Sequence, residues 1–299
     1  MWIPRFACPE CGSDVHGGDA LQHCAACGRH YESRDGIWRF LTVERAADAE
    51  SFTRQYRSIR EREGYRASSA EYYRRLPEVA ADDPHATEWR IRRESYEHLL
   101  THVLQPSGTP LRILDLGAGN GWLSNRLASR GHDLCAVDRI ADEADGLGAI
   151  RHYVPRFTAV QASFDALPFA SGQFDLVVFN GSLHYARDGA ATLAAARRLL
   201  ADGGTLAVMD SPMFDDDRSG RAMVADMVRR FECDYGLREI VRSGVGYLTF
   251  GSLARTAREL GASTSFIPSR GPLAWRLRRE IARFRLGRAP AAFGVWVAR

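Results

Sequence analysis

The stretch Leu111-Arg112-Ile113-Leu114-Asp115-Leu116-Gly117-Ala118-Gly119-Asn120-Gly121 decides the fold of this 299-residue chain. Its first half is short and mostly apolar, which is typical of a buried strand. Three glycines then occupy alternate positions, and because glycine has no Cβ, such a loop can bend tightly and approach a ligand closely. We therefore predict a strand, a nucleotide-binding glycine loop and a helix that begins near Trp122.

The spacing of these glycines differs from that of two other nucleotide-binding loops. The dinucleotide fingerprint Gly-x-Gly-x-x-Gly has its third glycine one residue later. The phosphate-binding P-loop needs a lysine after its last glycine, but all 40 basic residues of this chain are arginine. Neither loop fits this sequence.

The run instead resembles motif I of the class I S-adenosylmethionine-dependent methyltransferases. Further segments agree with that family in their order: a second strand that ends at Asp138, a loop at Phe164 to Phe169, and a fourth strand at Phe174 to Asn180. The resemblance covers Pro110 to Asp210 well. It implies an α/β fold with a seven-stranded Rossmann-like sheet, mostly parallel with an antiparallel last strand.

The resemblance also implies S-adenosylmethionine as the cofactor and suggests which residues hold it. Asp138 is expected to accept hydrogen bonds from both ribose hydroxyls, because an acid at the end of the second strand is the usual partner of a ribose. Ser163 stands where many relatives have an aspartate, so the adenine is expected to contact Ser163, the backbone of Phe164 and apolar side chains. The full expected cofactor set is Asp115, Gly117, Ala118, Gly119, Gly121, Asp138, Arg139, Ser163, Phe164 and Asn180.

Two Cys-x-x-Cys pairs near the start of the chain predict a metal site. They are formed by Cys8 with Cys11 and by Cys24 with Cys27, and twelve residues separate them. Four thiolates on two such turns give a closed tetrahedral zinc site, which is structural because no coordination position stays open. Two disulfides are the alternative interpretation.

These motifs divide the chain into three parts. We expect a zinc ribbon over residues 1–43, a helical bridge or lid over 44–105 and the methyltransferase domain over 106–299, in which an insert at 211–251 covers the acceptor. Helices are expected over Glu50 to Arg75 and Ala86 to Leu104. The resemblance suggests that Tyr56 or Arg92 contacts the carboxylate of the methyl donor, whereas ordinary packing on the core is the alternative.

The expected reaction is methyl transfer to a small-molecule acceptor, such as a biosynthetic metabolite. His184 follows the fourth strand and is the candidate general base, since the imidazole pKa of about 6.5 suits proton transfer near neutrality. Two alternatives remain open. The chain could methylate rRNA or tRNA through the ribbon and a basic C-terminal segment, or it could be a non-catalytic binding protein with this fold.

Charge and hydropathy add expectations about location and partners. The net charge is only +3, but Arg270 to Arg299 contains eight arginines and the single acid Glu280. That segment is interpreted either as a solvated helix face or as a site for a polyanion. No apolar stretch reaches the ~20 residues that span a bilayer, and the first residues lack a signal-peptide pattern, so we expect a cytoplasmic protein without a membrane partner.

Overall fold

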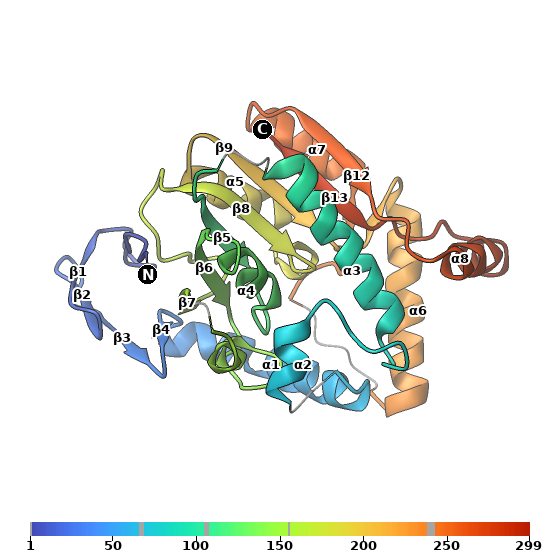
Figure 1. The fold of residues 1–299 in the computed structure, drawn as a ribbon, viewed down its shortest axis with the longest axis horizontal. Helices are drawn as coiled ribbons and strands as arrows, with labels where there is room; N and C mark the ends of the chain where they lie inside the picture. Colours follow the sequence, from blue (N-terminus) through green and yellow to red (C-terminus); the bar gives the residue numbers. More distant parts are fainter. Residues whose placement is uncertain (1, 66–68, 105–107, 155, 238–242) are drawn as a thin grey trace.

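The computed structural model describes residues 2–65, 69–104, 108–154, 156–237 and 243–299 (Figure 1). Its centre is a twisted sheet in which seven strands follow the order β7-β6-β5-β8-β9-β13-β12. Strands β7, β6, β5, β8 and β9 are parallel to one another, and β13 is antiparallel to both β9 and β12. This arrangement confirms the predicted Rossmann-like class. The strands are β5 (Arg112–Leu116), β6 (Asp133–Asp138), β7 (Thr158–Gln161), β8 (Phe174–Asn180), β9 (Leu200–Met209), β12 (Thr264–Pro268) and β13 (Gly294–Ala298).

Helices cover both faces of this sheet and create two apolar cores. One core lies between the sheet and α2, α3 and α4, and the other lies between the sheet, α5 and α7. Because both faces are buried, the central strands are almost continuously apolar instead of alternating, as in Ile113, Leu114 and Leu116. The covering helices are α2 (Ala70–Arg75), α3 (Ala86–His98, continued by a π-turn over Leu99–Val103), α4 (Trp122–Ala128), α5 (Gly189–Leu199) and α7 (Phe250–Glu259). Two short 3-10 turns, Leu147–His152 and Leu183–Tyr185, complete the loops near the site.

The cysteine-rich N-terminal segment is joined to the sheet, which corrects the expected count of seven strands. It forms an antiparallel meander whose last strand, β4, pairs in parallel with β7. The result is one continuous sheet of eleven strands among the described residues. Strand β7 would otherwise leave a row of unpaired backbone groups at the sheet edge, and β4 satisfies them. The four added strands are β1 (Val15–Gly17), β2 (Leu21–Cys24), β3 (His30–Arg34) and β4 (Ile37–Arg39).

The first helix of the bridge, expected from Glu50, begins earlier and is divided. Helix α1 (Val43–Arg62) starts at the N-cap Thr42, whose side chain accepts a hydrogen bond from the backbone N–H of Arg45. A separate helix, α2, follows it, so the single helix predicted over 50–75 is wrong. Residues 66–68 of that prediction, and the expected boundary at 105/106, lie outside the described residues.

The segment 211–251 also contains more structure than expected. Strands β10 (Met213–Phe214) and β11 (Leu248–Thr249) pair in parallel, and α6 (Asp217–Tyr235) lies between them in sequence. Asp216 caps α6 by accepting a hydrogen bond from the backbone N–H of Ser219. Residues 238–242 lie outside the described part. The last helix is α8 (Leu273–Leu286). None of the described helices combines the length and the hydropathy that crossing a bilayer requires.

Because β4 belongs to the main sheet, a core substitution in the ribbon should destabilise the whole molecule. Ile37 is 1% exposed and packs in the same core as strands β5, β6 and β7. We expect Ile37→Ala to lower the free energy of unfolding by about 2–5 kcal/mol. Leu21→Ala, at a ribbon side chain that is 52% exposed, is the control and should change it by less than about 0.5 kcal/mol. Urea unfolding followed by tryptophan fluorescence and circular dichroism measures both. Two separate transitions, with only the ribbon affected by Ile37→Ala, would contradict this prediction.

Candidate cofactor and acceptor site

A cavity opens at the carboxyl ends of β5, β6 and β8, beneath α1 and α3. This is where ligands bind in open parallel sheets. Its described lining comes from the sheet ends, from the lid helices and from one residue of the insert: Phe52, Tyr56, Arg60, Arg92, Gly117, Ala118, Gly119, Asn120, Trp122, Asp138, Arg139, Ile140, Asp145, Ala162, Phe164, Asn180, Gly181, Ser182, Tyr185 and Ser243.

The glycine loop forms the floor of the cavity, and its glycines are needed for different reasons. Gly117 has φ 76°, and a Cβ there would lie 2.3 Å from the Cβ of Ser182. Gly119 has φ 55°, and a Cβ there would meet only the backbone oxygen of Asp145, at 3.5 Å. Gly121 has φ 74° and is the N-cap of α4. Gly117 is therefore required by packing, whereas Gly119 keeps cavity space open and Gly121 turns the chain into the helix.

Asp138 is held at the end of β6 by two backbone donors. The N–H of Gly119 donates to its Oδ2 at 2.8 Å, and the N–H of Ile140 donates to its Oδ1 at 2.7 Å. Burial raises the pKa of Asp138 to about 6, against the effect of these hydrogen bonds, which favour the charged form. Each carboxylate oxygen accepts up to two hydrogen bonds, so both oxygens keep capacity for further donors. Asp138 lines the cavity as predicted.

Asp115, by contrast, is absent from the described cavity lining. It is fully buried under the loop, where its Oδ2 accepts a hydrogen bond of 2.8 Å from the Oγ of Ser124 on α4. Burial raises the pKa of Asp115 to about 7, and within the described chain its Oδ1 has no hydrogen-bond partner. Asp115 therefore supports the loop from behind by joining β5 to α4.

The segment expected to hold the adenine lies at the edge of the cavity next to β7. Phe164 lines the cavity and packs edge-to-face against Phe179, with 5.8 Å between ring centroids. Ser163 is 5% exposed, is not part of the described lining, and accepts a hydrogen bond of 3.2 Å from Nη2 of Arg139. Arg139 itself lines the cavity, so Ser163 acts on the site by orienting that arginine.

Three aromatic rings close the cavity on the side of α1. Phe52 and Tyr56 lie one helical turn apart with 5.8 Å between centroids, and Tyr185 contacts them at 5.9 and 6.1 Å. Tyr56 is among the residues predicted from sequence, whereas Phe52 and Tyr185 are not. The i, i+4 spacing of Phe52, Tyr56 and Arg60 was the available signal, since it places all three on one face of a helix.

Besides Arg139, two arginines of the lid helices bring positive charge to the cavity. Nε of Arg60 lies 3.4 Å from Oδ1 of Asp145, and its guanidinium stacks over the ring of Tyr65, 3.5 Å from the centroid. Arg92 extends from α3 and has no ion-pair partner among the described residues; its guanidinium lies 4.8 Å from the ring of Trp89. Both lid residues predicted from sequence, Tyr56 and Arg92, line the cavity.

His184 lies beside the cavity and not in its described lining. Its Nδ1 is 3.1 Å from the Oγ of Ser211, and burial, assisted by the charge of Arg92, lowers the pKa of His184 to about 3. A group with so low a pKa accepts a proton poorly near neutrality. Its role as a general base stays a prediction, and the residue that faces the cavity at this position is its neighbour Tyr185.

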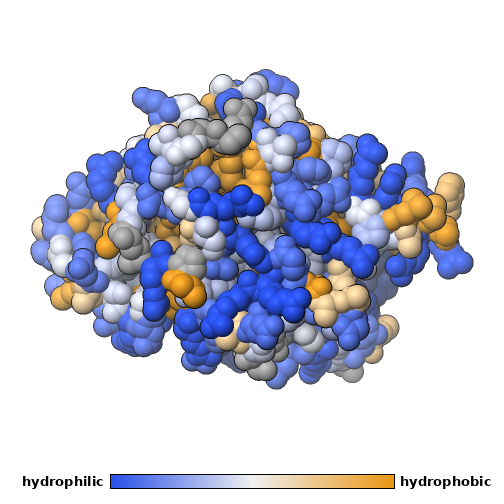
Figure 2. All heavy atoms as spheres, viewed as in Figure 1, coloured by the Kyte–Doolittle hydropathy of each residue, from blue (hydrophilic) through white to orange (hydrophobic). Residues whose placement is uncertain are grey.

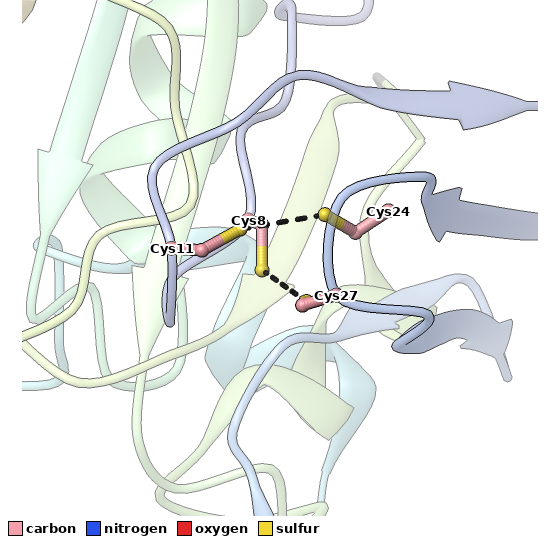
Figure 3. A group of neighbouring side chains, drawn as sticks. All are labelled: Cys8, Cys11, Cys24 and Cys27. Carbon is pink, nitrogen blue, oxygen red and sulfur yellow. Dashed lines mark hydrogen bonds between the residues drawn. The ribbon is translucent and has the colours of Figure 1, made fainter.

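The four predicted metal ligands converge at the tip of the ribbon (Figure 3). All four Sγ atoms lie within 4.8 Å of one another, with 3.6 Å between Cys8 and Cys27 and 3.5 Å between Cys11 and Cys24. A tetrahedral zinc thiolate site, with Zn–S near 2.3 Å, places its sulfurs about 3.8 Å apart. The donor set therefore fits zinc, and the sulfur separations are far longer than the ~2.05 Å of a disulfide.

Comparison with known proteins agrees with this geometry. Residues 114–208 match the family described as methyltransferase domain. An uncharacterized methyltransferase of Mycobacterium tuberculosis is 34% identical over 98 residues, which are 33% of this chain and 39% of that protein. A malonyl-[acyl-carrier protein] O-methyltransferase of Geobacter sulfurreducens is 34% identical over 122 residues, 39% of this chain and 45% of the relative. The chain thus spans about two fifths of the length of these relatives.

A solved structure is similar over a greater length but at low identity. It is the 1,6-didemethyltoxoflavin-N1-methyltransferase of Burkholderia thailandensis, with 17% identity, a TM-score of 0.49, and coverage of 93% of this chain and 97% of that chain.

Proposed function

We propose that this chain, whose residues 114–208 form a class I S-adenosylmethionine-dependent methyltransferase domain, transfers a methyl group from S-adenosylmethionine to a small molecule. One observation carries the proposal. The cavity that begins at Asp138 and the glycine loop continues to a wall of three aromatic rings under α1, so donor and acceptor would share one covered space. Such a concave, partly apolar site suits a small ligand better than an extended polymer.

The residues at the sheet ends fit the donor. Asp138 offers carboxylate oxygens to the ribose hydroxyls, Gly119 leaves space beside them, and Phe164 offers an apolar surface to the adenine. Bound S-adenosylmethionine supplies an activated methyl group on a sulfonium. The protein then has to align the acceptor with that methyl group and exclude water, which α1 and the aromatic wall would do.

Donor binding should depend on the charge of Asp138. Asp138→Ala removes the ribose acceptor and should weaken S-adenosylmethionine binding by about 2–4 kcal/mol in calorimetry at pH 8. In the wild type, affinity should fall as the pH drops through about 6, because protonation takes an acceptor away from the ribose. The matched control is Asp202→Ala, at an exposed aspartate in the first half of β9. This variant should bind S-adenosylmethionine as the wild type does. Unchanged affinity in Asp138→Ala would remove the basis for the donor site.

The charges in the cavity favour an acceptor that arrives as an anion. The carboxylates of the described lining, Asp138 and Asp145, already have partners, and His184 is a poor base. Arg92 provides a cation on the lid side, where an acceptor carboxylate could pair with it. An ionised carboxylate needs no general base before methylation. Relatives that carry the name malonyl-[acyl-carrier protein] O-methyltransferase are consistent with carboxyl oxygen as the target.

A labelling experiment tests the acceptor class. The protein is incubated with methyl-labelled S-adenosylmethionine and either the small-molecule fraction or the total RNA of a bacterial extract. We expect the label in the small-molecule fraction and expect alkali to release it as volatile methanol, because methyl esters hydrolyse in base. Arg92→Gln should reduce this transfer at least tenfold, whereas Arg93→Gln, whose side chain is 48% exposed on the same helix, should not. Label in RNA would favour the RNA methyltransferase alternative, and donor binding without any transfer would favour a non-catalytic protein.

We also propose that Cys8, Cys11, Cys24 and Cys27 hold one structural Zn²⁺. The ribbon is small, and its inner wall includes Tyr31, whose hydroxyl lies 3.0 Å from the Sγ of Cys8. A module of this size gains much of its folding free energy from its metal.

Metal analysis should return about one zinc per chain. Cys24→Ser should lose the zinc and lower the thermal unfolding midpoint of the whole protein, because β4 belongs to the main sheet. Cys233→Ser, at an exposed cysteine of α6, is the control and should keep the metal. Disulfides among the four cysteines in mass spectra of the unreduced protein would contradict the proposal.

A further inference from the structure

Helix α8 is attached to the rest of the molecule along one narrow side. It lies at one end of the molecule's long axis, beyond α6, and projects from the rest of the structure (Figure 1). Among its described side chains only Trp275 and Arg279 are partly buried. Trp275 packs against Phe293 with 6.3 Å between ring centroids, and Arg279 stacks over Trp275 and donates a hydrogen bond to the backbone oxygen of Ala291.

The apolar side of α8 faces away from the body. Leu273, Leu277, Ile281 and Phe284 are 65%, 56%, 54% and 86% exposed. At 100° per residue these four side chains fall within an arc of about 80°, nearly opposite to Trp275 and Arg279. Figure 2 shows the resulting apolar surface at the projecting end of the molecule. A helix of a globular protein normally turns its apolar stripe toward the core, so the reversed orientation indicates a surface that has an external partner.

Arginines border the apolar stripe on both sides. Arg276 and Arg283 lie along one border, Arg278 and Arg285 lie along the other, and Glu280 is the only acid of the helix. Their long stems bring the guanidinium groups alongside the exposed apolar residues. A partner that fits this helix must therefore offer an apolar interior between negative charges.

We propose that α8 is a membrane-surface helix that docks the protein on an anionic phospholipid bilayer. The four apolar side chains would enter the region between headgroups and acyl chains, and the bordering arginines would contact lipid phosphates. This is the pattern of interfacial amphipathic helices, which lie in the plane of a bilayer and do not cross it. The inference departs from the expectation of no membrane partner, and it is independent of the proposed methyl transfer.

The distribution of charge favours a bilayer over two other partners. A second copy of the chain that covered the same stripe would bring two arginine-bordered helices into contact, with like charges on both borders. An RNA would pair with the arginines but would leave the most exposed residues, Phe284 and Leu273, against a highly charged polymer. An anionic bilayer satisfies both the charge and the apolar stripe.

The fixed position of α8 also suits a docking element. The backbone N–H groups of Arg270 and Gly271, which precede the helix, both donate to the carboxylate of Glu94 on α3, at 2.8 Å each. Contact with a bilayer through α8 would thus orient α3, the helix that brings Arg92 to the cavity.

Co-sedimentation with lipid vesicles tests the proposal on the full-length protein. Vesicles of phosphatidylcholine alone are compared with vesicles that contain equal parts of phosphatidylcholine and phosphatidylglycerol, at low and high salt. We expect binding to the anionic vesicles and a decrease with salt. Leu277→Asp/Phe284→Asp should lower the partition coefficient at least tenfold, because both side chains lose their apolar burial. Val43→Asp, at an apolar side chain that is 82% exposed on α1, is the matched control and should bind as the wild type does.

The variants also separate the competing partners. The thermal unfolding midpoint of Leu277→Asp/Phe284→Asp should equal that of the wild type, since both side chains are exposed. Arg278→Glu/Arg285→Glu should weaken binding to anionic vesicles as well. No vesicle binding by the wild type would overturn the proposal. So would a dimer that Phe284→Asp dissociates, or RNA binding that is lost with the arginines but unaffected by Phe284→Asp.

Discussion

The close approach of β5 and β8 at their carboxyl ends is the constraint on which the site depends. The backbone of Gly117 lies against Ser182, and the hydroxyl of Ser182 donates a hydrogen bond to the backbone oxygen of Leu116. With no room for a Cβ between them, the loop after β5 lies low across the strand ends and presents the backbone N–H of Gly119 to Asp138. The floor of the cavity, the position of the carboxylate and the start of α4 all follow from this one contact.

The ribbon also contacts the site, on the side where β6 ends at Asp138. The side chain of Arg39 on β4 donates to Gln161 at 3.0 Å, and Gln161 in turn donates to the backbone oxygen of Arg139, also at 3.0 Å. Arg139 follows Asp138 directly and lines the cavity. The proposed metal module is thus connected through two polar side chains to the residues that would bind the donor. The ribbon is therefore an integral part of the domain and not a separate module joined to it by a linker.

Much of the sheet and its glycine loop could be predicted from sequence because the signals are local. A short apolar run before Gly117, a strand that ends at Asp138 and two Cys-x-x-Cys turns each depend on neighbouring residues. The pairing of β4 with β7 could not be predicted, because the backbone hydrogen-bonding groups of an edge strand can pair with any extended segment that reaches them. The aromatic wall and the displacement of His184 from the cavity also depend on distant contacts, between α1 and the loop after β8. Asp115 and Asp138 both belong to predicted strands, and only the structure shows that Asp115 is buried beneath the glycine loop whereas Asp138 lines the cavity.

The pairing of β4 with β7 has a consequence for how the chain is made. Ile37 on β4 pairs with Ala159 on β7, which lies more than a hundred residues later in the sequence. During synthesis β4 therefore leaves the ribosome well before its partner strand. At roughly 5–20 residues per second, this interval lasts about 6–24 s. During that time an apolar strand edge, with Ile37 and Trp38 uncovered, is available to other nascent chains. Early closure of the ribbon around a metal would shorten the freely moving segment and leave a single compact unit for β7 to meet. With the proposed zinc in the ribbon, the timing of metal supply relative to translation would affect how much correctly folded protein a cell obtains.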